Sequence, residues 1–293
     1  MAVDASGLAN PLMVLDLAEV RRRRRALSGT SLQLWISASV LALVALACFV
    51  GPLIFTLPSP NYASLNGALP FLSSGHLFGT DDLGRDILSR TLYGGRVSFE
   101  VGFGSVAIGF LVGGTLGLCA GYLGGKVDVV IARVLDTFLA FPALVLALAV
   151  ATYLGPNERD EIFAIAFFTI PGYGRYTRGA AVRLREEEFL AANQMLGGKN
   201  SYILLRHVLP NIVGTLITFG FLTVAAAMLA EAGLSFLGAG IRPPAPSWGN
   251  MIVEGQSFVS DAPHIFLVPS AFLFVTILSL NLVGDALRRR WHV

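Results

Sequence analysis

Few ionisable side chains interrupt the apolar stretches of this sequence, and they are the first candidates for chemistry. Glu231 lies near the end of one apolar stretch, with Ser235 one helical turn later, and Asp136 lies in another, three residues after Arg133. A carboxylate in such a stretch is costly unless it faces protein or water, so Glu231, Ser235 and Asp136 are candidate pore or outer-gate residues. A structural alternative remains open for each acid: Glu231 can bond a neighbouring backbone amide or arginine, and Asp136 can pair with Arg133.

No nucleophile–base set and no metal-ligating cluster accompanies these residues. The histidines are scattered, and both cysteines fall inside apolar runs without the spacing of a zinc or redox pair. A phosphate-cradling loop needs the pattern G-x-x-x-x-G-K-[ST], which neither Gly125-Lys126 nor Gly198-Lys199 completes. We therefore expect the chain not to be an enzyme, to bind no cofactor and no metal, and to leave any ATP hydrolysis to other proteins.

The composition is that of an all-α membrane protein with the lipid bilayer as its surroundings. Hydrophobic residues make up 54% of the 293 residues, charged residues make up 14%, and the mean hydropathy is +0.68. A soluble domain carries about 25% charged residues. The net charge of +2 gives no electrostatic reason to expect a nucleic-acid partner.

Six stretches are candidates for transmembrane helices, which need roughly 20 apolar residues. The fourth is the weakest, because its uncharged part ends before Arg175, and Pro142 and Pro171 should kink or locally break the third and fourth. The domain organisation is then a cytoplasmic N-terminal segment, 1–32, followed by a transmembrane domain, 33–293. The six stretches are 33–57, 97–123, 129–154, 162–180, 209–236 and 264–285.

The distribution of lysine and arginine sets the orientation of these spans. With the N-terminus in the cytoplasm, 16 of them lie on the inner side and 5 on the outer side. Cytoplasmic loops carry the excess of positive charge in membrane proteins. Both termini are therefore expected in the cytoplasm, together with the charged segment 183–208 between the fourth and fifth spans.

The second span carries a ladder of glycines at a spacing of four residues, which places them on one helical face. Such small residues allow a neighbouring helix to approach closely. We expect a helix-packing seam made of Gly109, Gly113, Gly117 and Gly121.

The 183–208 segment is too polar to cross a membrane and predicts two short helices separated by a turn. Residues 189–196 favour a helix, and Gly197-Gly198 should end it, because glycine adopts the left-handed C′ position at little cost. Asn200 or Ser201 can cap the second helix. An element fixed at both ends by membrane spans can transmit force, although an ordinary charged loop is an equally open alternative at this point.

The outer side is expected to carry two long loops, 58–96 and 237–263. In the first, Thr80 or Asp81 is a natural N-cap for a short helix that local ion pairs would lock. We expect this motif to contact an extracytoplasmic protein or a second membrane subunit. Its charged members are Asp81, Asp82, Arg85 and Asp86.

Three motifs in this order resemble those of ABC importer permeases, over roughly residues 30–288. Residues 192–197, followed after nine residues by 207–210, resemble the EAA loop, although Ala191 stands at its acidic first position and Asn193 at a position of alanine. The segments 78–86 and 231–249 look like the second, C-type permease subunit of dipeptide and oligopeptide importers. Nickel importers share that subunit type.

The resemblance implies a type I ABC importer permease fold with six transmembrane helices, in the plasma (inner) membrane of a bacterium. It implies a second homologous permease that completes the pore, two ATP-binding subunits that carry ATP and Mg²⁺, and an extracytoplasmic peptide-binding protein. A secondary transporter is the rival from another class, but it needs ionisable groups near the midplane and gives the 183–208 segment no role. The ATPase-coupling residues carried over are Glu188, Ala191, Ala192, Gln194, Met195 and Gly197, with His207, Leu209 and Pro210 completing the motif.

Overall fold

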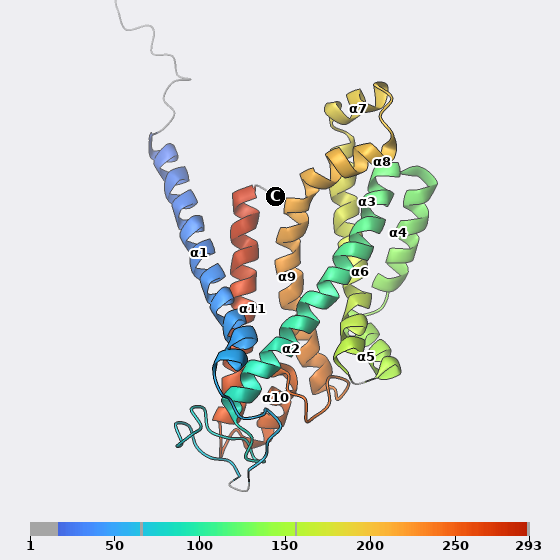
Figure 1. Ribbon diagram of the computed structural model, residues 1–293. Helices are drawn as coiled ribbons and strands as arrows, with labels where there is room; N and C mark the ends of the chain where they lie inside the picture. Colours follow the sequence, from blue (N-terminus) through green and yellow to red (C-terminus); the bar gives the residue numbers. More distant parts are fainter. Residues whose placement is uncertain (1–16, 65–66, 156, 292–293) are drawn as a thin grey trace, which may run out of the picture.

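The computed structural model describes residues 17–64, 67–155 and 157–291, and these residues form helices and loops without a β-strand. The first half of the expected N-terminal segment, 1–16, lies outside the described residues. The helices, drawn in Figure 1, are α1 (Leu17–Ile54), α2 (Ile87–Ile108), α3 (Gly114–Leu123), α4 (Gly125–Leu139), α5 (Ala143–Leu154), α6 (Glu158–Arg185), α7 (Glu188–Met195), α8 (Asn200–Ile203), α9 (Leu209–Phe236), α10 (Trp248–Gly255) and α11 (His264–Trp291).

Two π-helical turns join helices that would otherwise be separate. The turn Gly109–Gly113 connects α2 to α3, so that Ile87–Leu123 forms one continuous helical segment of 37 residues. The turn Leu204–Val208 likewise connects α8 to α9. Single π-helical turns inside α-helices occur frequently at functional sites.

Four helical segments of the described chain are long and apolar enough to cross a membrane, namely Ser31–Ile54, Ile87–Leu123, Asn200–Phe236 and His264–Trp291. A fifth crossing is the pair α4 and α5, if the pair counts as one span. α6, with 28 residues, corresponds to the expected fourth span and is long enough, at about 1.5 Å per residue, but it is charged at both ends.

The expected third span is a broken helix rather than one straight rod. α4 ends at Leu139, α5 begins at Ala143, and their axes differ by 83°. Pro142 lies at this break, which confirms the interruption expected there, since proline cannot continue the hydrogen-bond ladder of a helix. α6 runs through Pro171 as one helix.

The first expected span, 33–57, agrees with the apolar segment Ser31–Ile54, although the helix α1 itself begins earlier, at Leu17. Two other expected boundaries were wrong. α2 begins at Ile87 rather than 97, so the last ten residues of the expected 58–96 loop are helical. α6 extends to Arg185, which shortens the connection to α7 to two residues.

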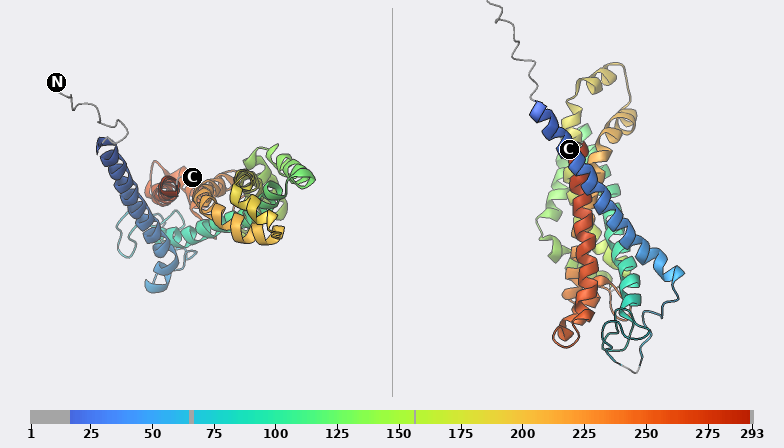
Figure 2. Two further views of the ribbon diagram at one scale, coloured as in Figure 1. Left: turned by 90° about the horizontal axis from the view of Figure 1, so that it is seen from above. Right: turned by 90° about the vertical axis from the view of Figure 1, so that its left-hand side faces the viewer.

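The helices form an elongated bundle with a small structured region at each end (Figure 1). α7 and α8 lie at one end, called the α7 end below, and α10 with the 58–86 loop lies at the opposite end, called the α10 end. The continuous segment α2–α3 packs along α6, while α1 packs against α11 and α11 against α9. Figure 2 shows α1 and α11 side by side at the edge of the bundle away from α4.

Two apolar clusters match this arrangement. The larger one surrounds the fully buried Trp248 and joins α2, α9, α10 and α11 through residues such as Phe99, Met228 and Leu273. The smaller one lies at the α7 end, where Leu190 and Ile203 pack against α3, α6 and α9. Each end region is therefore anchored to the bundle by its own core.

Candidate functional site

In the loop between α6 and α9, the helix α7 ends in a well-defined C-terminal cap. Gly197 has φ of +82°, its N–H donates to the Gln194 carbonyl oxygen at 3.0 Å, and the N–H of Gly198 donates to the Asn193 carbonyl oxygen at 3.0 Å. These two bonds form a Schellman motif, in which glycine takes the left-handed C′ position. The expectation that the glycine pair ends this helix is confirmed, while the residue before α8 is Lys199 rather than Asn200 or Ser201.

The underside of α7 is fixed to the bundle. Leu190 and Ile203 are fully buried in the cluster at the α7 end. Gln194 Nε2 donates to the hydroxyl of Tyr122, on α3, at 3.2 Å, and that hydroxyl donates to Asn200 Oδ1 at 3.4 Å. α7 is therefore held by α3 as well as by its covalent links to α6 and α9.

The opposite side of α7 is open. Met195 is 87% exposed and Leu196 is 88% exposed, at the tip of the molecule. A contiguous exposed apolar tip of this kind is typical of a protein-docking surface. The sequence did not single out Leu196. The six residues expected to contact an ATPase are all exposed, although Gln194 also bonds to Tyr122 on the underside: Glu188, Ala191, Ala192, Gln194, Met195 and Gly197.

The three remaining residues of the loop motif lie where the loop joins α9. Pro210 is the second residue of α9, just beyond the π-helical turn that joins α8 to α9. His207 packs its ring against Tyr202, with ring centroids 5.6 Å apart, and its Nε2 is buried without a hydrogen-bond partner among the described residues. Leu209 is half-buried.

The four glycines of the ladder face α6. A Cβ atom at Gly113 would clash with the carbonyl oxygen of Ile170, and one at Gly117 with the carbonyl oxygen of Gly174. A Cβ atom at Gly121 would clash with the carbonyl oxygen of Arg178, and one at Gly109 with the side chain of Thr169. The backbones of α2–α3 and α6 are in direct contact along this line.

At the α10 end, two buried arginines bring α2, α10 and the 58–86 loop together. Arg85 Nε donates to Asp81 Oδ2 at 2.6 Å, and Arg85 and Arg90 donate to Glu254 Oε2 at 3.0 and 2.9 Å. Arg90 is only 1% exposed and also donates to the carbonyl oxygens of Pro60 and Pro244. The four charges lie close together and form a network rather than isolated pairs.

The helix cap in this region is Asp86 and not Thr80 or Asp81. Its carboxylate accepts from the Ser89 N–H at 2.7 Å and starts α2, while its other oxygen lies 2.8 Å from His76 Nδ1. The 81–86 stretch itself is a turn, with Asp81 and Arg85 as the local ion pair and Asp82 exposed. The motif thus builds the start of α2 instead of a separate helix.

Glu231 is fully buried within the chain. Its carboxylate accepts hydrogen bonds from Ser98 at 3.2 Å, from Ser247 at 2.7 Å and from Ser235 at 3.4 Å. Ser98 in turn accepts from the Trp248 N–H at 3.1 Å. The carboxylate joins α2, α9 and the start of α10, and it is not exposed on any pore wall that this chain presents.

Asp136 has a different partner from the one expected. Its Oδ1 accepts from Arg175 Nη2, on α6, at 2.8 Å, so the expected pairing with Arg133 was wrong. A second α4–α6 link, which the sequence did not suggest, is the two-pronged contact between Asp128 and Arg178. Both links bind α4 to the α7-end half of α6, at sequence separations too long for local pairing rules.

Comparisons with known proteins show the family to which this chain belongs. Residues 113–292 match the family described as the binding-protein-dependent transport system inner membrane component. The chain is 40% identical, over 85% of its length and 84% of the relative, to the dipeptide transport system permease protein DppC of Alkalihalophilus pseudofirmus. It is 39% identical, over 85% and 82%, to the glutathione transport system permease protein GsiD of Pectobacterium atrosepticum. The chain belongs to this family of permeases.

Solved structures support the same fold. The permease resembles a chain of the MetNI methionine ABC transporter, with a TM-score of 0.58 and 14% identity over 69% of this chain and 95% of that one. A chain of an amino acid ABC transporter gives a TM-score of 0.53 at 16% identity, over 69% and 94%. The protein is therefore an all-α, multi-pass inner-membrane permease of an ABC importer, with the type I importer fold, and it works with partner subunits.

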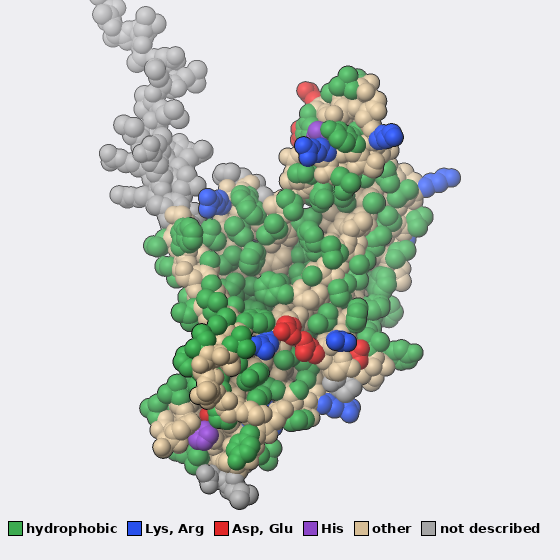
Figure 3. Space-filling view, in the orientation of Figure 1, with side chains coloured by type: hydrophobic (Ala, Val, Ile, Leu, Met, Phe, Trp, Pro, Cys, Tyr) green, Lys and Arg blue, Asp and Glu red, His purple; other side chains and the backbone are tan. Residues whose placement is uncertain are grey.

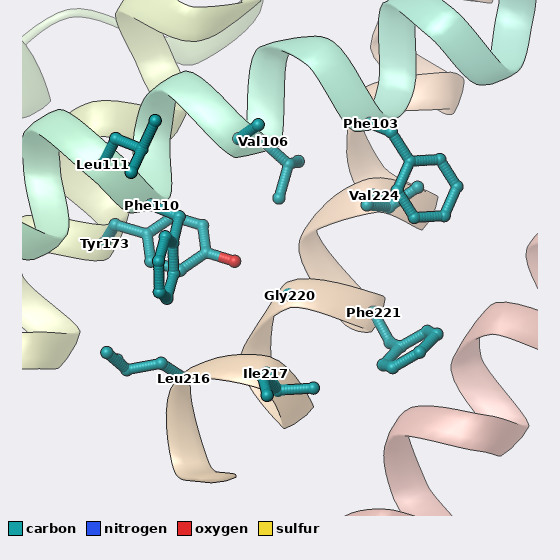
Figure 4. Close-up of a pocket in the computed structure, with 11 residues that line it drawn as sticks. Phe103, Val106, Phe110, Leu111, Tyr173, Leu216, Ile217, Gly220, Phe221 and Val224 are labelled. Atoms are coloured by element: carbon teal, nitrogen blue, oxygen red, sulfur yellow. The ribbon is translucent and has the colours of Figure 1, made fainter. Parts of the chain in front are cut away.

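The permease also contains an apolar cavity of about 440 Å³ between α2, α6 and α9. Figure 4 shows Phe103, Phe110 and Tyr173 on one side of it and Ile217 and Phe221 on the other. A cavity of this size and lining is typical of ligand sites, which measure about 300–1,000 Å³ and are mostly apolar.

Proposed function

We propose that this permease is one half of the translocation pore of an ATP-driven importer of dipeptides or oligopeptides. The support comes from two relatives at about 40% identity, whose names specify a dipeptide and glutathione as cargo. Both cargoes are short peptides with a free amino group. A nickel importer of the same subunit type is the alternative from the sequence, and neither of these two relatives is named for nickel.

The observation that carries the proposed mechanism is the two-sided arrangement of α7. One side is exposed and apolar at Met195 and Leu196, and the other is bonded to α3 through Gln194 and Tyr122. An ATPase subunit that docked on the exposed side would move α3, α6 and α9 together, because all three are attached to the loop. Closure of two ATPase subunits would then switch access across the membrane.

The assembly that follows has this chain beside a second, homologous permease, above two ATP-binding subunits that hold ATP and Mg²⁺. A peptide-binding protein would dock at the α10 end. This orientation places the α7 end, both termini and most of the arginines in the cytoplasm, as the positive-inside rule requires.

The first test is co-purification of the tagged chain in mild detergent from cells that express its neighbouring genes. We expect a second permease and two ATP-binding subunits, with ATPase activity that a peptide-loaded binding protein stimulates. If only a nickel-loaded binding protein stimulated the ATPase activity, the ABC-importer assembly would be supported, and the cargo would be nickel instead of a peptide. Recovery of an ATP-independent transporter without partners would refute the proposal.

A further inference from the structure

Three glutamates near the junction of α5 and α6 lie close together, with Arg159 beside one of them. Glu100 is exposed on α2, and Glu158, the first residue of α6, is half-buried and within hydrogen-bonding reach of it. Glu161, one turn further along α6, is only 2% exposed, and both of its carboxylate oxygens lack a hydrogen-bond partner. Glu161 interacts electrostatically with the buried Glu231 and with Glu158.

Within the described residues, no arginine or lysine forms an ion pair shorter than 4 Å with these three carboxylates, although Arg159 interacts electrostatically with Glu158. Arg96, one turn before Glu100, instead donates to the Phe49 carbonyl oxygen at 3.0 Å and lies over the rings of Phe49 and Tyr93. A buried carboxylate without a partner is costly, and adjacent carboxylates repel each other. With three acids and one nearby arginine, the cluster carries an excess of negative charge, which favours a positive group from outside the chain.

The position of Glu100 shows where that group would enter. Glu100 is the only charged residue in the wall of a second cavity, of about 470 Å³, whose other walls come from apolar residues of α1, α2, α9 and α11. Phe103 and Phe221 belong to this cavity and also to the one in Figure 4, so the two cavities are neighbours. Figure 3 shows a small group of acidic and basic side chains, lying side by side, on a face that is otherwise largely apolar.

A face of this composition is unsuited to contact with lipid. Ionisable side chains at membrane depth face protein or a water-filled cavity, because their exposure to hydrocarbon is costly. The described chain has no group of three or more His, Cys, Asp or Glu residues arranged to hold a metal ion. An organic cation with an apolar body fits a carboxylate cluster beside apolar cavities better than a metal ion does.

We propose that Glu100, Glu158 and Glu161 bind the α-ammonium group of the peptide in transit, while the adjoining apolar cavities accept its side chains. The inference rests on the proposed peptide-importer function. An ammonium group offers three hydrogen-bond donors and a full positive charge, which complement the two carboxylates at the surface and the unpartnered one behind them. The site recognises the end common to all peptides, so it suits an importer of varied sequences.

The first experiment measures import into proteoliposomes that contain the complete transporter, with its binding protein and ATP. The probes are radiolabelled Ala-Phe dipeptide and its N-acetylated form. For Glu100→Gln we expect import of the free dipeptide to fall at least fivefold, and its preference over the acetylated form to shrink by a similar factor. Stimulation of the ATPase by loaded binding protein should stay within twofold, and Glu100→Asp should retain more import. Asp261→Asn, which removes an exposed charge elsewhere at the α10 end, is the matched control.

The second experiment tests access to the site without measuring transport. Glu100→Cys, in a background with Cys119→Ser, is treated with a cationic methanethiosulfonate in the assembled transporter; Cys48 is buried and can remain. We expect the thiol to react, and to react more slowly when the Ala-Phe dipeptide, binding protein and ATP are present. A thiol that reacts in the isolated chain but not in the complex would place Glu100 in a subunit interface and overturn the inference.

The outcomes separate this inference from the function on which it rests. If the wild-type transporter does not import the free dipeptide, the proposed function fails and the ammonium site fails with it. If the wild type imports the dipeptide and Glu100→Gln does so equally well with unchanged preference, only the ammonium site is refuted. Loss of the second permease from the Glu100→Gln complex would also refute it.

Discussion

Gln194 on α7 and Tyr122 on α3 are 72 residues apart and are joined by a hydrogen bond of 3.2 Å from the amide Nε2 to the phenol oxygen. The same phenol donates to Asn200 at the start of α8, so one hydroxyl holds both short helices of the loop. The loop is therefore attached to α3 by side chains and not only to α6 and α9 by the chain itself.

Removing this hydroxyl should loosen the loop without unfolding it. In Tyr122→Phe the ring stays in the apolar cluster while two hydrogen bonds are lost, each worth about 1 kcal/mol, or roughly fivefold in an equilibrium. We expect fewer peptides imported per ATP hydrolysed, with the subunits still co-purifying. Tyr153→Phe, at an exposed tyrosine of α5, is the control. An unchanged ratio in Tyr122→Phe would mean that α3 takes no part in coupling.

The turn after α7 should be sensitive to the type of residue at position 197. The φ of +82° at Gly197 is strained for residues with a Cβ, by about 1–2 kcal/mol, and most strongly for β-branched residues. Gly197→Val should hydrolyse ATP without importing peptide, with assembly in the membrane intact. Asn adopts left-handed conformations readily, so Gly197→Asn should retain coupling. Normal import by the valine variant would count strongly against a coupling role for α7.

The glycine ladder provides a test of helix packing. A Cβ at Gly117 would clash with the Gly174 carbonyl oxygen, whereas one at Gly172, also in a helix, meets no atom within 4 Å. Gly117→Ala, and more strongly Gly117→Leu or Gly113→Leu, should lower the melting temperature and the yield of assembled transporter. Gly172→Ala should be neutral or stabilising, because alanine favours helix. A fully assembled and active Gly117→Leu variant would show that the ladder is not a required seam.

The buried Glu231 should contribute to stability more than to transport specificity. Glu231→Ala leaves the hydroxyls of Ser98 and Ser247 without their acceptor and opens a cavity among α2, α9 and α10. Hydrogen bonds to a charged group are worth about 1.5–3 kcal/mol each. We expect a clear fall in the thermal stability of the purified transporter, whereas Glu186→Ala, at an exposed acid, should have little effect. Equal melting temperatures for the two variants would contradict the structural role of Glu231.

The features that could be predicted from the sequence are those that depend on neighbouring residues. The glycine pair at 197–198 ends α7, and Pro142 interrupts the third span, because both effects act within a few residues. What it missed depends on contacts between distant segments. Arg90 meets Glu254 across 164 residues, and Asp136 meets Arg175 across 39. No spacing rule connects such residues.

The predicted start of α2 was wrong for a related reason. The charged residues 81–90 looked like part of a loop, because charges are rarely placed in a membrane helix. Arg90 is nevertheless buried in the second turn of α2, since Glu254 and three backbone or side-chain oxygens around it replace water. A hydropathy pattern cannot distinguish a charge that is neutralised inside the protein from one that lies in water.

The continuous segment Ile87–Leu123 begins among the buried arginines of the α10 end and ends beside Tyr122 at the α7 end. At about 1.5 Å per residue, this single helical rod spans about 55 Å. It is bonded at one end to the loops that would meet a delivery protein and at the other to the loop that would meet an ATPase. If the chain works as proposed, a change of contacts at the α10 end would tilt this one segment at the α7 end. The π-helical turn Gly109–Gly113, which lies against α6, would be the pivot of that tilt.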